Sequence, residues 1–177
     1  MLKPISEVMG SRVVDLDNSQ TLGEVINWVI NPDKKQISAL LVKPNRPFAR
    51  SLAIVPIDIV EYGPKIVVVR NDGALVAPKE ILHLPKLMRK KHRVLGNPVV
   101  TQAGKKLGSV DDLLFETIDA SIQKIYVCPG LLGIFNQPDL ILGVDKIIAI
   151  ESNRIVVQDD SDQWETVKKT ATVPTSN

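Results

Sequence analysis

The residues able to carry acid–base or nucleophilic chemistry are few in this chain and do not gather in its sequence. The two histidines, His83 and His92, lie in one basic segment, and Cys128 is the only thiol. Asp111 and Asp112 are adjacent, so on a strand they point to opposite faces and cannot readily share a proton. Neither phosphate-binding pattern, G-x-x-x-x-G-K or G-x-G-x-x-G, occurs. The sequence therefore predicts no catalytic site and no enzyme.

One stretch has a superficial likeness to a calcium-binding loop but lacks the residues that such a loop needs. DLDNSQTLGEVI begins with Asp15 and Asp17, yet Gln20 stands in place of the turn glycine and Ile26 in place of the bidentate glutamate. A single cysteine excludes an intramolecular disulfide and a thiolate-rich metal site. A later acidic cluster is interpreted as a solvated tail: Asp159, Asp160 and Asp162. We expect no metal and no cofactor.

A basic segment at residues 77–93, APKEILHLPKLMRKKHR, is the strongest shift in composition. It holds one acid and six basic residues: Lys79, Lys86, Arg89, Lys90, Lys91 and Arg93. Residues 1–92 carry 14 Lys and Arg against 9 Asp and Glu, a net charge of +5, and residues 93–177 carry 8 against 11, a net −3. Together with Arg46 and Arg50 of an earlier loop, the segment is a candidate surface for RNA, the ribosome or an anionic membrane.

The alternative interpretation of residues 77–93 is a solvated linker whose leucines pack between two barrels: Leu82, Leu84 and Leu87. Pro78 suits the first turn of a helix, whereas Pro85 should interrupt a helix because it has no amide proton to donate. No aromatic residue lies in the segment to stack on nucleic-acid bases. Both interpretations stay open from the sequence.

An apolar loop, GLLGIFNQP, follows Pro129, where the first half of the chain has NRPFARS. Its large apolar residues are Leu131, Leu132, Ile134 and Phe135. Burying one such side chain stabilises a protein by roughly 1.5–3 kcal/mol, so something should cover them. The loop is predicted either to pack on a neighbouring barrel or linker, or to bind a protein partner or a second copy of the chain.

These candidate residues are set in a sequence that repeats itself. LGEVINWVINPDKKQISALLV at residues 22–42 matches LGSVDDLLFETIDASIQKIYV at residues 107–127, with an offset of 85. Later matches place Asp58 opposite Asp145, and IVVV from Ile66 opposite IVVQ from Ile155. Two copies do not make a solenoid, so each unit is expected to close its own small core.

Short runs rich in valine and isoleucine, separated by turn formers such as NPDKK and ESNR, are typical of strands. Five strands are predicted in the first unit, at residues 12–16, 23–30, 36–42, 51–55 and 65–70, and five in the second, at 98–101, 108–116, 121–127, 140–142 and 154–158. A unit this small removes its open edges by closing into a barrel. We therefore predict an all-β fold of two tandem small β-barrels joined by a basic, partly helical linker.

Four residues are predicted to have structural roles at turns. Gly23 and Gly108 lie where a turn enters the long second strand of each unit, and glycine there permits a positive φ or a close backbone approach. Asp58 forms with Glu61 a pattern able to cap a single helical turn after the fourth strand. Asp145 is its expected counterpart in the second unit.

The predicted organisation is a first barrel at residues 1–76, the linker at 77–93, a second barrel at 94–160 and a polar tail at 161–177. In the tail, Trp164 and Val167 are three residues apart and suit one helical turn. No apolar run approaches the roughly 20 residues that span a bilayer, and the first residues lack the apolar core of a signal peptide. We expect a cytoplasmic protein.

Twice over, the chain has G-x-x-V-V, a turn, L-G-x-V, a turn, a β-branched strand ending at a proline, and V-P-x-D or G-V-D before I-V-V. This order resembles the PRC-barrel family, named for the photosynthetic reaction centre H subunit and also found in a ribosome maturation factor. The likeness covers roughly residues 8–70 and 94–158. It implies a non-catalytic barrel that docks onto other macromolecules.

The predicted function is therefore an adaptor that binds a protein partner, or associates with itself, through the GLLGIF loop and the crevice between the barrels. RNA or ribosome association through the basic segment is one alternative, and peripheral contact with an anionic membrane is another. No small-molecule substrate is expected.

Overall fold

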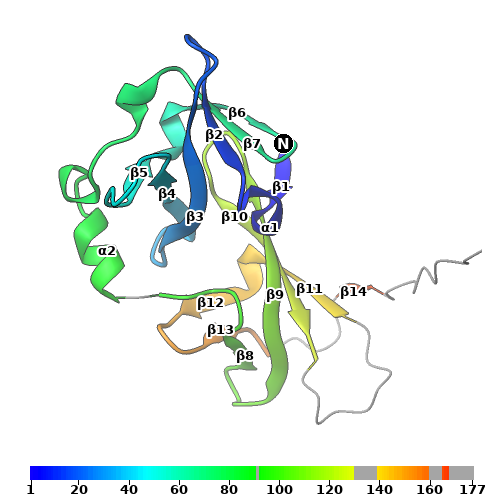
Figure 1. The fold of residues 1–177 in the computed structure, drawn as a ribbon. Coiled ribbons are helices and arrows are strands. Elements are labelled where there is room, and N and C mark those ends of the chain that lie inside the picture. The colour runs from blue at the N-terminus through cyan, green and yellow to red at the C-terminus, as the bar shows by residue number, and fades with distance from the viewer. Residues whose placement is uncertain (91, 130–138, 160–164, 168–177) are drawn as a thin grey trace, which may run out of the picture.

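A computed structural model describes residues 1–90, 92–129, 139–159 and 165–167 of the chain, with side chains up to residue 159 (Figure 1). The first half contains β1 (Leu2–Pro4), α1 (Ile5–Val8), β2 (Arg12–Asp15), β3 (Thr21–Asn31), β4 (Gln36–Pro44), β5 (Leu52–Ile54), the helical turn η1 (Pro56–Asp58), β6 (Ile59–Gly63) and β7 (Ile66–Val69). The turns η2 (Asp72–Ala74) and η3 (Pro78–Glu80) and the helix α2 (Leu84–Lys90) lead to the second half. That half contains β8 (Pro98–Thr101), β9 (Lys106–Glu116), β10 (Ile122–Cys128), β11 (Asp139–Gly143), η4 (Val144–Lys146), β12 (Ile147–Ile150), β13 (Ile155–Val157) and β14 (Glu165–Val167).

All ten predicted strands are present, and the all-β fold with two barrel-like units is confirmed. Four strands were not predicted from the sequence: β1, β6, β12 and β14. Val167 lies in β14, which pairs with β11, so the helical turn expected there is wrong. The sheet order is β5-β4-β3-β2-β7-β6 in the first unit and β12-β13-β8-β9-β10-β11-β14 in the second, and each sheet curls into a half-barrel.

The repeat in the sequence is reproduced in the register of the strands. Val25 faces Val42 in the first unit, and Val110 faces Val127 in the second, an offset of 85 on both strands. Both β-bulges of the β3–β4 hairpin recur at the matching places of the β9–β10 hairpin. Because a bulge fixes the register of a strand pair, the two hairpins are the same structure built twice.

The later strands follow a different offset from the one expected. Val69 pairs with Ile59, and Val157 pairs with Ile147, so the last two strands of each unit are related by an offset of 88. This offset sets Val67, and not Ile66, opposite Ile155. The match of IVVV with IVVQ is therefore wrong by one residue. Aligning identical residue types does not show which residues pair between strands.

The two units face each other across an approximate two-fold axis. Gln36 and Ser121, which are equivalent in the repeat, form an antiparallel bridge. On either side, Ile37 N–H donates to Ala120 O and Ile122 N–H donates to Lys35 O, both at 2.9 Å. Each of these bonds is the image of the other under the offset of 85. The two hairpin turns therefore meet as two copies meet in a symmetric dimer.

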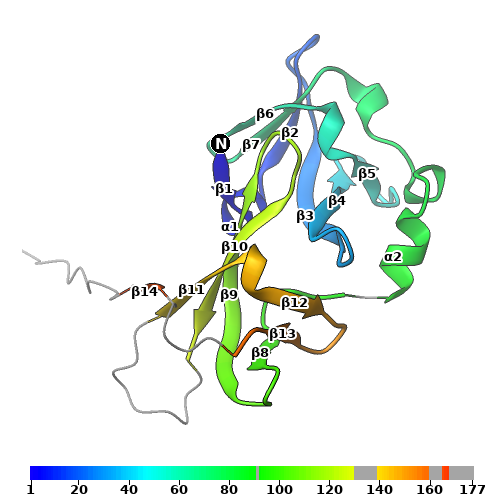
Figure 2. The ribbon, with the colours of Figure 1, turned by 180° about the vertical axis from the view of Figure 1, so that it is seen from behind.

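The first residues of the chain pack on the second unit, although the strands that follow them belong to the first (Figures 1 and 2). β1 pairs with β9, with Lys3 opposite Phe115, and the turn α1 is held by Asp112, whose carboxylate accepts Ser6 N–H (3.3 Å) and Ser6 O–H (2.5 Å). The chain then returns to its own unit, where Gly10 N–H donates to Val25 O (2.9 Å). The first eight residues thus join the two sheets.

The expectation that each unit closes its own core is wrong. One cluster of buried apolar residues runs through both units, and it includes Ile5 and Val8 of α1. Within this cluster, Phe115 of the second unit is fully buried and meets Tyr62 of the first edge to face, with ring centroids 5.5 Å apart. Burial raises the pKa of the Tyr62 hydroxyl. Two half-barrels leave their apolar faces open, so each covers the other.

A smaller cluster on the outer face of the first sheet explains the apolar run ALLV in β4. Leu40 and Val42 face the shared core, whereas Ala39 and Leu41 face outward and are covered by α2. Leu84 is the α2 residue at the centre of this outer cluster. A strand buried on both faces has no polar alternation.

Packing of the linker leucines between the two barrels was one expectation from the sequence. The linker packs instead on the outer face of the first unit. Leu84 is buried and Leu87 packs beside it, but Leu82 is 82% exposed. Pro85 does not interrupt the helix, because it lies in the first turn of α2, where an amide has no acceptor within the helix. Pro78 begins η3, in the place expected for it.

Candidate functional site

The residues able to do chemistry are not brought together by the fold. His83 is exposed before α2, and Cys128 ends β10, with its Sγ 3.8 Å from the Pro129 carbonyl oxygen. Asp112 supports α1, and Asp111 is exposed on the strand beside it. In the part of the chain that the structure describes, no three His, Cys, Asp or Glu side chains are placed to hold a metal ion.

The acids of DLDNSQ brace their own loop. Asp15 is buried, and its carboxylate accepts Asp17 N–H (2.8 Å), Asn18 N–H (3.1 Å) and the Asn18 side-chain amide (3.1 Å). These bonds, the one from the Asn18 side chain first, lower the pKa of Asp15. In the second unit Asp159 braces the corresponding loop by accepting Ala103 N–H (3.0 Å), which lowers the pKa of Asp159. Of the predicted tail cluster, Asp160 and Asp162 lie outside the described residues.

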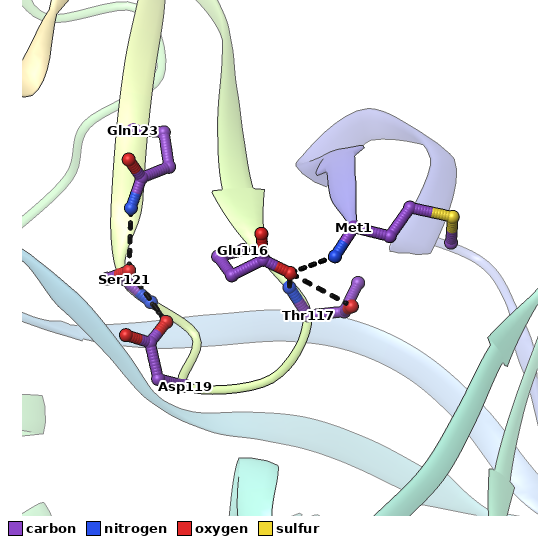
Figure 3. Close-up of polar contacts among 6 residues, drawn as sticks. All are labelled: Met1, Glu116, Thr117, Asp119, Ser121 and Gln123. Atoms are coloured by element: carbon purple, nitrogen blue, oxygen red, sulfur yellow. Dashed lines mark hydrogen bonds and ion pairs between the residues drawn. The ribbon is translucent and has the colours of Figure 1, made fainter.

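A second group of acids lies next to the Gln36–Ser121 bridge, the contact between the two hairpin turns that we call the seam (Figure 3). Glu116 pairs with the amino group of Met1, and this bond lowers the pKa of Glu116. Asp119 accepts Ser121 O–H (2.6 Å) and Ser121 N–H (2.9 Å), and the hydroxyl bond is the main reason that the pKa of Asp119 is lowered. These carboxylates fix the β9–β10 turn, where the two units meet.

The four residues predicted at turns have different surroundings. Gly23 and Gly108 lie inside β3 and β9, and a Cβ added there would be 2.4 Å from Lys43 O and 2.2 Å from Cys128 O respectively. Both positions are close backbone approaches, and Gly108 also has a φ of +153°.

The capping role expected of Asp58 is wrong, because it ends η1, whose N-cap is Val55 and has no side-chain cap. The pairing of Asp58 with Asp145 is wrong too. The offset of 88 sets Ile57 of η1 opposite Asp145, the middle residue of η4.

A hollow of about 470 Å³ lies between the two units, next to the seam. It is lined by η1, by the linker ahead of α2 and by the β9–β10 turn. Three large apolar side chains at its edge, one from each element, are almost fully exposed: Ile57 (86%), Leu82 (82%) and Ile118 (82%). We call these three residues the apolar rim. Lys34 and Asp119 also line the hollow and give it one charge of each sign.

Sequence reasoning anticipated a crevice between the barrels but missed the apolar rim. The signal was a lone isoleucine among turn residues, in VPID at Ile57 and in ETID at Ile118. An isoleucine has no role in the hydrogen bonding of a turn, so one placed there in both units is a hint of a binding surface.

A second hollow, of about 460 Å³, separates β3 from α2 and the segment that follows it. Its lining is mostly apolar and includes Trp28, Val29, Ile30, Leu41, Met88 and Leu95. His92 also lines it, and both ring nitrogens of His92 are buried without a hydrogen-bond partner. A buried polar atom without a partner is costly, so this histidine is suited to meet a hydrogen-bonding group in the hollow.

The basic segment forms the outward face of α2 and its continuation. Lys86, Arg89, Lys90 and Arg93 are exposed. Among the described residues, none of these four forms an ion pair. Arg46 and Arg50 are exposed in a different loop, between β4 and β5. Of the predicted basic residues, Lys91 lies outside the described part of the chain.

The predicted apolar loop also falls outside the described residues, which stop at residue 129 and resume at residue 139. Its proposed contact residues therefore stay a prediction: Leu131, Leu132, Ile134 and Phe135. No helix in the described ranges combines the length and the hydropathy of a membrane-spanning segment.

Two half-barrels of one topology, which share a core and have a hollow between them, define a tandem β-barrel module. The sequence model described as the PRC-barrel domain matches residues 2–76 and again residues 88–163, and the chain belongs to the PRC-barrel family. No curated protein matches the chain. PRC-barrel domains occur in proteins of the binding or adaptor type and are generally non-catalytic.

Proposed function

We propose that this tandem PRC-barrel protein is a non-enzymatic adaptor that docks a protein partner in the hollow between its two units. The apolar rim is the observation that carries the proposal. Full burial of each of its side chains against a partner would contribute roughly 1.5–3 kcal/mol of binding free energy, relative to exposure to water. Exposed large apolar side chains around a hollow that also has polar and charged lining residues are typical of a binding site for another protein. A cytoplasmic location belongs to the same proposal.

The position of the rim also supports an adaptor. Ile57, Leu82 and Ile118 come from η1, the linker and the second unit, so the patch exists only when the whole chain is folded. Backbone hydrogen bonds on either side of the Gln36–Ser121 bridge hold the two units together next to these elements. A preformed patch loses little conformational entropy on binding.

An aspartate in the apolar rim is expected to abolish partner binding. Affinity purification of the intact protein, followed by mass spectrometry, identifies the partner, and its affinity is then measured with purified proteins. Ile118→Asp should weaken binding by roughly a hundredfold or more, since it loses apolar burial and desolvates a charge.

Ile148→Asp is the matched control, because Ile148 is an exposed isoleucine of β12 that does not line the hollow. Thermal unfolding checks that both variants stay folded. Equal affinity of the two variants for the partner would contradict docking at the rim. Phe135→Asp in the same assay tests the predicted apolar loop.

A second candidate function is binding of single-stranded RNA, and the exposed, unpaired basic face of α2 is the observation that favours it. Affinity for a labelled oligoribonucleotide should fall steeply with salt, with a slope of about −0.7 for each phosphate contacted. Arg89→Glu with Lys90→Glu should make that slope shallower by about 1.4, whereas Lys65→Glu and Arg70→Glu, near β7, should leave it unchanged. Anionic vesicles in a flotation assay are the competing surface. Salt-independent binding, or binding to vesicles alone, would exclude the RNA function.

A further inference from the structure

The two long strands of the repeat differ in what lies along one edge. The final residues of β9 have β10 on one side and β1 on the other. The equivalent residues of β3 pair with β4, but among the described residues no strand pairs with them on the opposite side. That open edge, from Trp28 to Ile30, lines the hollow beside α2.

The backbone groups that face this edge follow from the second unit. Glu116 N–H donates to Ser121 O (2.9 Å), toward β10, whereas Thr117 N–H donates to Met1 O (3.0 Å), on the side of β1. Because the direction of the backbone groups alternates along an antiparallel strand, the N–H and C=O of Phe115 also point toward β1. Ile30 is the residue equivalent to Phe115, so its N–H and C=O face the hollow.

Neighbouring donors on this edge are already satisfied or missing. Trp28 N–H is taken by the side chain of Asn27 (2.9 Å), as Leu113 N–H is taken by Asp112 (2.8 Å). The next outward position is Pro32, which has no amide proton. By this register, the Ile30 amide is the one N–H group at this end of β3 that is placed to donate to an added strand.

The missing strand can be traced in the sequence. The offset of 86 that relates Gly10 to Gly96 sets Leu2–Pro4 of β1 opposite residues 88–90, which form the end of α2. The same offset sets Ser6 opposite His92. Ser6 bonds to Asp112, but the nitrogens of His92 bond to nothing, although Asn27 lies in the same hollow. Among the described residues, the first unit thus has an open position next to β3, where the second unit has β1, because the equivalent residues 88–90 form the end of α2.

We propose that this edge of β3 accepts an extended segment of a partner protein as an added strand, paired through the backbone of Ile30. Trp28, Val29 and Ile30 line the hollow, and most of its other lining is apolar, so it suits a short run of β-branched apolar residues. Arg93 lines the hollow, and Arg89 and Lys90 are exposed on α2 next to Met88, which also lines it. These basic residues suit acidic residues flanking that run. His92 is placed to bond to a peptide group of the segment.

This inference goes beyond the adaptor function proposed above, because it uses a different hollow and does not depend on the apolar rim. The probe is a synthetic peptide, Asp-Asp-Val-Val-Val-Asp-Asp, with both ends blocked, titrated into the isotope-labelled full chain and followed by NMR. We expect the Ile30 amide signal to shift downfield and its hydrogen exchange to slow at least tenfold, whereas Phe115, already paired with β1, does not change.

Methylation of the central valine nitrogen is the deciding control, since it removes the strand hydrogen bond and keeps every side chain. It should weaken binding roughly tenfold or more. Met88→Trp, which fills the hollow from α2, should also abolish binding, and Met88→Leu should preserve it. Binding that is indifferent to the methyl group would overturn the proposal, even if Met88→Trp failed to fold.

The other occupants give distinct results. A shift of Ile30 caused by dilution-dependent self-association would assign the edge to a second copy of the chain. The same shift caused by oligouridine would assign the hollow to nucleic acid. Either result, or no shift of Ile30 at a millimolar peptide concentration, overturns the proposal. None of these results depends on Ile118. The proposal of docking at the apolar rim and the proposal of strand addition at β3 can therefore be rejected independently.

Discussion

Replacing Phe115 with alanine is expected to lower the free energy of unfolding by about 3–5 kcal/mol, a large part of the stability of a domain of this size. Phe115 is fully buried, and its ring meets Tyr62 of the other unit edge to face at 5.5 Å. The substitution therefore removes apolar burial, leaves a cavity and breaks an aromatic pair. Urea denaturation followed by circular dichroism measures the loss.

The same experiment tests whether the two units fold as one. Because the buried cluster is continuous, Phe115→Ala in the second unit should also lower the unfolding midpoint reported by Trp28 in the first. Trp164→Phe makes Trp28 the sole tryptophan and leaves its fluorescence as the probe. A single transition, seen alike by fluorescence and circular dichroism, is the expected result.

Two controls separate the shared core from general damage. Tyr62→Phe keeps the ring contact and removes only a hydroxyl, so it should cost less than Phe115→Ala. Ile148→Ala changes a partly exposed side chain and should cost about 1 kcal/mol or less. A Trp28 transition that is unmoved by Phe115→Ala would mean that the units are independent.

The sequence predicted those parts of the fold that depend on local signals. Alternating apolar residues and turn formers located ten strands, and the match of Leu22 to Val42 with Leu107 to Val127 located two equivalent hairpins. These signals lie within a few residues of the structure that they specify. Even the bulges recur with the repeat, because each copy carries the same pattern of buried positions.

The parts that escaped prediction depend on contacts distant in the chain. β1 has only three residues and is a strand because β9 lies beside it. Separate cores were expected because nothing local shows that Ile5 and Val8 fill the gap between two half-barrels. The packing of Leu84 on the outside of β4 is likewise a tertiary choice. Local propensity is a weak guide where tertiary burial decides.

The candidate sites divide in the same way. The exposed basic face of α2 was evident as a run of charge, and a crevice between the units was expected from the repeat. The apolar rim was not found, since Ile57 and Ile118 come from turns that only the seam brings together. The open edge of β3 needed the register of both units, because it is defined by comparison with β9.

Gly108→Ala is expected to be the most damaging small substitution, with a cost of about 3 kcal/mol or more. An added Cβ would lie 2.2 Å from Cys128 O, so the backbones of β9 and β10 must separate where Ser109 faces Cys128. The φ of +153° adds strain, since residues with a Cβ rarely adopt it. The free energy of unfolding in urea measures the combined effect.

Two other glycines separate these causes. Gly23→Ala makes the same clash, at 2.4 Å from Lys43 O, without a positive φ, and should cost about 1–3 kcal/mol. Gly96→Ala has a φ of +78° but no atom within 4 Å of the new Cβ, so only backbone strain of about 1–2 kcal/mol is expected. If Gly108→Ala costs no more than Gly96→Ala, the strands move apart easily to admit the methyl group. Close packing of the strands at the entry to each long hairpin would then not be the reason that both copies of the repeat have glycine there.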